Sequence, residues 1–232
     1  MKSLNFRYIF RFPNDRQEIF DLRLDTQTLD IVGVTPEELP SWTNLDFHQC
    51  PNCQLTIQNH PNCPVAVHLV KLVAIFKSVV SYDEIQVDII MPDRIVFKDT
   101  TAQKGISSLM GLIMATSGCP HLSYLKPMAR FHLPLASTEE TVYRATSMYL
   151  LSQYFIRKQG QEADLELKGL AEIYRNIEII NEAIANRLRA ISDKDSAINA
   201  LILLDIYAKT LPYAIEDSLK EIQHLFAPYF RK

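Results

Sequence analysis

The sequence has little glycine and no long uninterrupted apolar run. Its 232 residues include six glycines but twelve prolines, which predicts few flexible loops and several rigid connections. The longest apolar stretch, residues 65–80, is broken by His68, Lys71 and Lys77, so no membrane span is expected. The first twelve residues lack the charged and apolar blocks of a signal peptide. We therefore expect a cytoplasmic protein.

Concentrated positive charge is also missing. Lysine and arginine number 24 against 27 acidic residues, for a net charge of -3, and no basic run of five or six residues occurs. Nucleic-acid binding is therefore not expected. No Walker A, Rossmann or nucleophile-elbow pattern is present, so the common nucleotide-binding and hydrolase classes have no support. The 47% hydrophobic content is enough to form one large core or two small ones.

Alternating apolar residues predict an antiparallel sheet in the first part of the chain. Residues 6–12 and 20–24 alternate between apolar and polar, and a turn sequence separates them. Residues 29–34 suggest a third strand. Residues 85–90 and 95–97 suggest a further hairpin.

Helical spacing predicts most of the remaining structure. A helix is expected over residues 65–80, and a second one runs to Ser117 from a capping box that begins at Thr100. Gly118 then stands where a helix C-terminal glycine belongs. A second capping box begins at Ser137, and Pro212 is expected to open the last helix.

These patterns predict an α+β protein. Residues 1–136 should form an antiparallel sheet with packed helices and a cysteine-rich loop, and residues 137–232 should be helical. No Gly/Ser linker divides the two regions, so packing as one domain and packing as two both stay possible. The apolar stripe over residues 170–191 is expected to pack in the core rather than to form a coiled-coil seam.

Four cysteines form the clearest chemical signal. Cys50 and Cys53 make a C-x-x-C pair, Cys63 follows after nine intervening residues, and Cys119 lies directly after the predicted helix end. In a reducing compartment such cysteines indicate metal binding or catalysis rather than disulfides. The surrounding segment, 36–64, has no periodicity, and a metal ion could order it.

Several ligand sets are consistent with the sequence. Zinc prefers four tetrahedral ligands, which four cysteines supply, as do three cysteines with His48, His60 or His121. An iron–sulfur cluster is a second possibility, although the cysteine spacing matches neither common ferredoxin pattern. Thiols that bind no metal are a third. A thioredoxin-like redox role fits poorly, because that motif opens a helix after a strand.

A second group of candidate residues follows Cys119. Lys126 and Arg130 could hold an anion, and His121 or His132 could act as a general acid or base, within a proline-stiffened connection. The structural alternative is that these groups are paired with neighbours and support the fold. An enzyme with its site at these residues is therefore an alternative function.

Two motifs carry a resemblance to a known family. They are the segment from Gly111 to His121, read GLIMATSGCPH, and the segment from Lys126 to Pro134, read KPMARFHLP. With the cysteine loop and residues 149–154, they resemble an uncharacterised family of bacterial proteins over nearly the whole chain. The resemblance implies a bacterial, cytoplasmic setting and assigns no activity, cofactor or functional residue.

The sequence therefore predicts a bacterial cytoplasmic protein with a structural zinc site. The protein is expected to act through an unknown protein partner or by forming homo-oligomers. The enzyme and the iron–sulfur redox or sensor protein are the alternatives.

Overall fold

A four-stranded antiparallel sheet forms one side of the molecule. The computed structural model describes residues 3–13, 15–33, 38–76, 79–191 and 196–230. Strands β1 (Ser3–Arg11), β2 (Gln17–Asp25), β3 (Glu84–Ile90) and β4 (Ile95–Thr101) lie in the order β2-β1-β3-β4. β1 and β2 form one hairpin, β3 and β4 form the other, and β1 pairs with β3.

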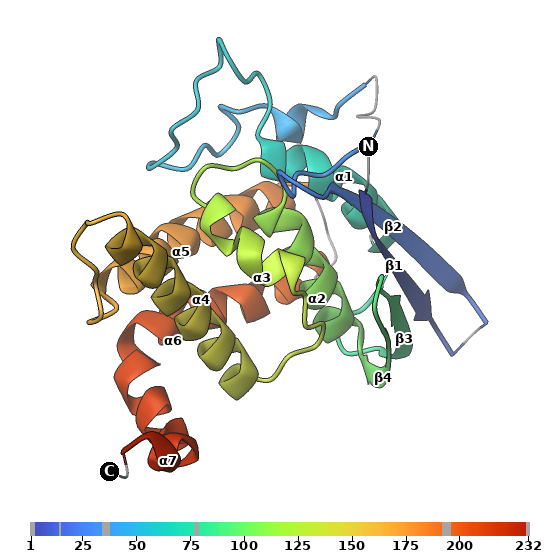
Figure 1. Ribbon diagram of the computed structural model, residues 1–232. Helices are drawn as coiled ribbons and strands as arrows, with labels where there is room; N and C mark the ends of the chain where they lie inside the picture. The colour runs from blue at the N-terminus through green and yellow to red at the C-terminus, as the bar shows by residue number, and fades with distance from the viewer. Residues whose placement is uncertain (1–2, 14, 34–37, 77–78, 192–195, 231–232) are drawn as a thin grey trace.

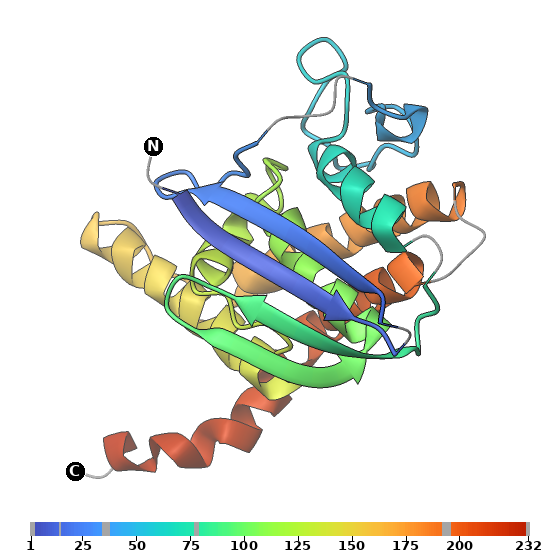
Figure 2. The same cartoon turned by 90° about the vertical axis from the view of Figure 1, so that its right-hand side faces the viewer.

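The sheet buries only one of its faces. On β1 and β2 every second side chain is buried, in agreement with the alternation of the sequence. Figure 2 shows the sheet in front with all of the helices behind it. The front face carries exposed charged pairs such as Arg7 and Asp21, whose guanidinium Nε donates to the carboxylate at 2.7 Å.

Helices α1 (Pro64–Phe76) and α2 (Ala102–Ala115) pack behind the sheet. α2 approaches it closely because residue 105 is glycine: a Cβ there would lie 3.0 Å from a methyl group of Val87. α2 ends at Ala115 with Thr116 as its C-cap, so Gly118, which has a φ of 88°, lies two residues past the cap instead of directly after the helix as predicted. The connection that follows contains the 3-10 turn η2 (Ser123–Leu125) and the short helix α3 (Lys126–Arg130).

The second half of the chain is helical. α4 (Thr138–Lys158) begins with the predicted capping box at Ser137. α5 (Lys168–Arg189) packs against α6 (Ser196–Ile222), and α6 packs against α2. The turn η3 (Gln223–Phe226) and helix α7 (Ala227–Phe230) end the described chain, which extends away from the other helices (Figure 1).

The predicted α+β class is confirmed, and the sheet and helices share buried residues. The buried hydrophobic side chains form one cluster that includes Leu4 in β1, Leu109 in α2 and Leu201 in α6. None of the described helices is both long and apolar enough to cross a membrane.

Three further local predictions were wrong. Residues 29–33 form a single bridge, Leu24 with Ile31, instead of a strand, and Val34 lies outside the described residues. The capping box at Thr100 is not formed, because β4 continues to Thr101 and the helix starts one residue later than predicted. Pro212 does not open a helix, since α6 runs through it without interruption.

Candidate functional site

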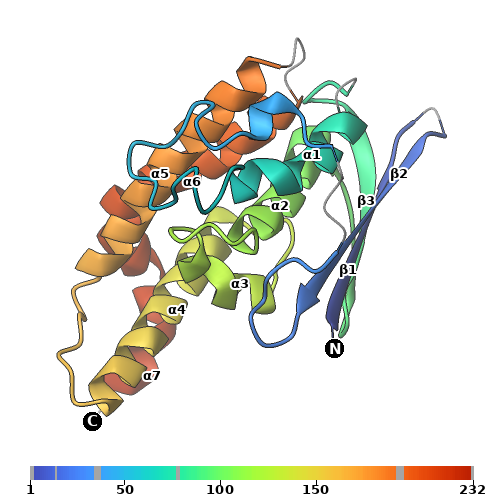
Figure 3. The ribbon, with the colours of Figure 1, turned by 90° about the horizontal axis from the view of Figure 1, so that it is seen from above.

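The cysteine loop, residues 38–63, lies across α5 and the start of α1. It contains little regular structure beyond the turn η1 (Ser41–Thr43), and Figure 3 shows it above α5 and α6. Its two ends are joined by a bridge between Asn44 and Asn62, and the N–H of Cys63 donates to the carbonyl of Thr43 at 2.7 Å. Cys63 is thereby fixed at the start of α1, where its own carbonyl accepts from Val67.

Arg187 of α5 anchors this loop from below. Its side chain is buried, with 1% exposure, and its two terminal nitrogens donate three hydrogen bonds to backbone carbonyls. The acceptors are Trp42 at 2.7 Å, Asn44 at 2.7 Å and Leu45 at 2.9 Å. No described carboxylate forms an ion pair with this guanidinium, and its Nε has no hydrogen-bond partner among the described residues. A buried cation without an acidic partner is stabilised by any negative charge that lies nearby.

Asn52, inside the C-x-x-C turn, joins the loop to two further elements. Its side-chain amide donates to Asn176 of α5 at 2.8 Å. Its backbone carbonyl accepts a hydrogen bond from Nε2 of His121 at 2.7 Å. His121 lies two residues after Cys119, so this contact joins the segment after α2 to the turn between Cys50 and Cys53.

All four cysteines are electrostatic neighbours. Burial, together with the nearby thiols of Cys63, Cys119 and Cys53, raises the pKa of Cys50 to about 12, and Arg187 opposes this rise. Burial and the thiols of Cys63 and Cys53 likewise raise the pKa of Cys119 to about 11. Cys119, which is distant in sequence, therefore lies within electrostatic range of the other three cysteines.

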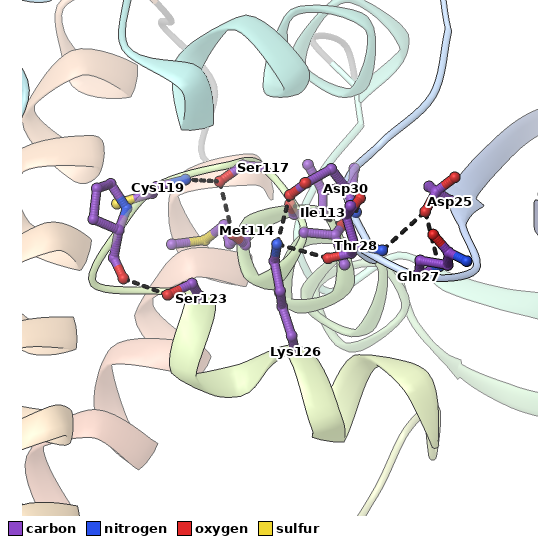
Figure 4. Close-up of polar contacts among 12 residues, drawn as sticks. Asp25, Gln27, Thr28, Asp30, Ile113, Met114, Ser117, Cys119, Ser123 and Lys126 are labelled. Atoms are coloured by element: carbon purple, nitrogen blue, oxygen red, sulfur yellow. Dashed lines mark hydrogen bonds and ion pairs between the residues drawn. The ribbon is translucent and has the colours of Figure 1, made fainter.

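The backbone around Cys119 is suited to hold a thiolate. The N–H groups of Leu122 and His121 act against the raised pKa because they hydrogen-bond to the sulfur and stabilise its charged form. The Cys119 N–H itself lies 3.3 Å from Oγ of Ser117, and Figure 4 shows this residue in the turn after α2. Backbone donors of this kind also tune thiolates that bind metals.

The sulfurs are not arranged as a closed ligand cage. Among the described residues no group of three or more cysteine, histidine, aspartate or glutamate side chains has metal-ligand geometry. The electrostatic coupling of the thiols does not conflict with this absence of ligand geometry, because charges interact over distances much longer than a metal–sulfur bond. The thiols lie within electrostatic range of one another, and coordination of a metal ion would require their side chains to turn toward one centre.

The three alternative histidine ligands differ in position. His48 and His60 are exposed, and neither contributes to the electrostatics of Cys50 or Cys119. His121 donates through Nε2 to a carbonyl, which leaves Nδ1 as the lone-pair nitrogen of a neutral ring. His48 and His60 belong to the loop itself, whereas His121 contacts it from the segment after α2.

The second group of candidate residues does not converge on one point. Nζ of Lys126 forms an ion pair with Asp30 at 2.6 Å and also donates to the carbonyl of Thr28 (Figure 4). Arg130 is exposed, with its guanidinium over the ring of Phe131. These contacts support the structural explanation for both residues.

His132 is held inside the fold by Tyr8. Its Nε2 lies 2.5 Å from the Tyr8 hydroxyl, which also contacts Ser108 at 3.1 Å. Burial, together with the positive charge of Arg144, lowers the pKa of His132 to about 3. The ring is therefore neutral near pH 7 and is a poor general acid.

Sequence reasoning missed Arg187, the residue that anchors the loop. A signal was present, because position 187 follows Ile180 by seven residues and Ile184 by three. That spacing places it on the buried face of α5. A charged residue at such a position indicates a buried polar contact, but the partner could not be read from the sequence.

The chain belongs to a family of unknown function. The model of the domain of unknown function DUF6901 matches residues 6–227. No curated protein and no solved structure is significantly similar to the chain. Membership in an uncharacterised family confirms the resemblance noted from the two sequence motifs and assigns no activity.

Proposed function

We propose that this protein binds one zinc ion through Cys50, Cys53, Cys63 and Cys119. The ion would fasten the cysteine loop to the start of α1 and the end of α2. The observation that carries the proposal is the hydrogen bond from His121, two residues after Cys119, to the carbonyl of Asn52 inside the C-x-x-C turn. Four thiolates are a common ligand set of structural zinc sites.

The charge of the surroundings supports the same ligand set. Zinc with four thiolates carries a net charge of about -2, and the guanidinium of Arg187 lies near enough to act on Cys50. The described residues give Arg187 carbonyl partners only. An anionic metal centre would supply the negative charge that this buried cation lacks.

A closed four-thiolate site leaves no coordination position for a substrate, so the metal has a structural role in this proposal. The protein would then act by association with a protein partner or with itself. Exposed apolar side chains on α4, which include Leu151, Tyr154 and Phe155, support an association surface. A reducing bacterial cytoplasm is the setting in which the four thiols stay available to the metal.

The test is the metal content of a cysteine variant. We expect the wild-type chain, purified under anaerobic conditions, to carry one zinc per chain and the double variant Cys50→Ser/Cys53→Ser to lose it. The matched control is His48→Ala/His60→Ala, which removes two exposed candidate ligands from the same loop and should retain the zinc. Full zinc retention by the cysteine double variant would overturn the proposal.

The same measurement separates zinc from an iron–sulfur cluster. Four thiolates can also hold a cluster, which would give a brown preparation that contains iron and absorbs broadly in the visible range. A colourless preparation that contains zinc and no iron is the result expected here.

A further inference from the structure

A large cavity lies among the helices, separate from the cysteine loop. Its volume is about 1380 Å³, and it extends from the ends of β1 and β4 to the inner face of α5. α2, α4, α5, α6 and the segment before α4 all contribute to its wall, and these helices are gathered behind the sheet in Figure 3. Small-molecule sites are commonly cavities with mostly apolar walls and a few polar groups.

Asn181 presents an unpaired amide to this cavity. The residue has 1% exposure, and neither its oxygen nor its nitrogen has a hydrogen-bond partner among the described residues. Buried amides in folded proteins are almost always paired, because an unpaired one carries a large desolvation cost. A bound molecule that both donates and accepts a hydrogen bond would satisfy Asn181.

Arg144 presents a cation to the same cavity. Its Nη2 donates to the carbonyls of Met128 at 2.9 Å and Phe131 at 3.1 Å. Its Nε and Nη1 make no hydrogen bond with the described residues. Burial lowers the pKa of this guanidinium, and the nearby Tyr174 and Glu140 oppose the shift. A carboxylate would be a suitable partner for the two unused nitrogens.

The spacing of the polar groups sets the length of the ligand. The charge of Arg144 acts on the phenol of Tyr174, which places Arg144 beside that residue. Tyr174, Ile177 and Asn181 share one face of α5 and all line the cavity. Tyr174 and Asn181 are seven residues apart, which is about 10 Å along a helix, and the side chain between them is apolar.

We propose that this cavity binds a small organic carboxylate with a hydroxyl or amide group about 10 Å from the acid. The carboxylate would contact Arg144 and Tyr174, the apolar chain would pass Ile177, and the distal polar group would pair with Asn181. The proposal is independent of the zinc site, because no described residue of the cysteine loop lines the cavity.

Three matched probes test it by titration calorimetry on the full chain. The probe 8-hydroxyoctanoate carries both polar ends, octanoate lacks the hydroxyl, and 1,8-octanediol lacks the carboxylate. We expect 8-hydroxyoctanoate to bind at least about tenfold more tightly than either of the others, since each leaves a buried group unpaired. Equal affinity for the three probes, or no binding of any, would overturn the proposal.

Two variants assign the ends of the ligand. Arg144→Met should remove the advantage of 8-hydroxyoctanoate over the diol, and Asn181→Leu should remove its advantage over octanoate. Asn181→Leu should also raise the melting temperature of the ligand-free protein by a few degrees, because it removes an unpaired buried amide. A large fall in that melting temperature would show that Asn181 has a structural partner and would overturn its role in binding.

Discussion

Replacement of Arg187 by methionine should weaken both the fold and the metal site. The substitution removes three hydrogen bonds from a charged donor to the carbonyls of Trp42, Asn44 and Leu45. Each carbonyl left without this donor costs about 1–3 kcal/mol, and methionine offsets part of that cost because it fills much of the volume and removes a buried charge. We therefore expect the free energy of unfolding to fall by about 3 kcal/mol.

The assay is urea unfolding of the zinc-loaded protein, together with its zinc affinity. Arg189→Met is the matched control, because Arg189 is on the same helix but exposed, and its loss should cost about 0.5 kcal/mol or less. Zinc affinity should fall by about tenfold or more in Arg187→Met, as for other groups that support metal ligands. If Arg187→Met unfolds at the same urea concentration as Arg189→Met, Arg187 does not anchor the loop.

Two further predictions concern the core behind the sheet. His132 has a folded pKa of about 3 against 6.5 unfolded, so its contribution to stability is complete above pH 6.5 and is lost as the pH falls toward 3. Between pH 7 and 5 the free energy of unfolding should fall by about 2 kcal/mol by linkage. Urea unfolding of His132→Gln should show a flatter pH profile over this range. Gly105→Ala should destabilise the fold by about 1 kcal/mol, because the added methyl would crowd Val87 and Phe10. Gly111→Ala should instead stabilise it by about 0.5–1 kcal/mol through helix propensity. Thermal unfolding of the two variants checks both signs.

The elements that follow a clear period were predictable from the sequence. β1 and β2 alternate strictly because only one sheet face is buried, and the helices that cover it keep a helical spacing. The capping box at Ser137 was recognised correctly because its bonds are local: Ser137 and Glu140 exchange hydrogen bonds within one turn.

The wrong predictions arose where tertiary contacts overrule a local preference. Thr100 has a capping sequence but stays in β4, because it pairs with Ile85 of β3. Residues 29–31 have the apolar composition of a strand, but only Ile31 forms a bridge, and its N–H donates to the carbonyl of Thr116. Pro212 has a preference for helix starts, yet it lies inside α6.

The candidate sites show the same division. The four-cysteine site stays a prediction, which the contact of His121 with the carbonyl of Asn52 supports by joining the segment after α2 to the loop. Arg187 and Asn181 could have been recognised as polar residues on the buried face of α5. Their surroundings could not, since the loop carbonyls and the cavity wall come from distant parts of the chain.

The central claim is that four cysteines form one zinc site. X-ray absorption at the zinc edge of the anaerobically purified protein tests it most directly, because it reports the number and type of ligand atoms. We predict one zinc per chain surrounded by four sulfurs at about 2.3 Å. A protein that contains no zinc after purification and reconstitution, or a zinc bound mainly by nitrogen and oxygen, would contradict the claim.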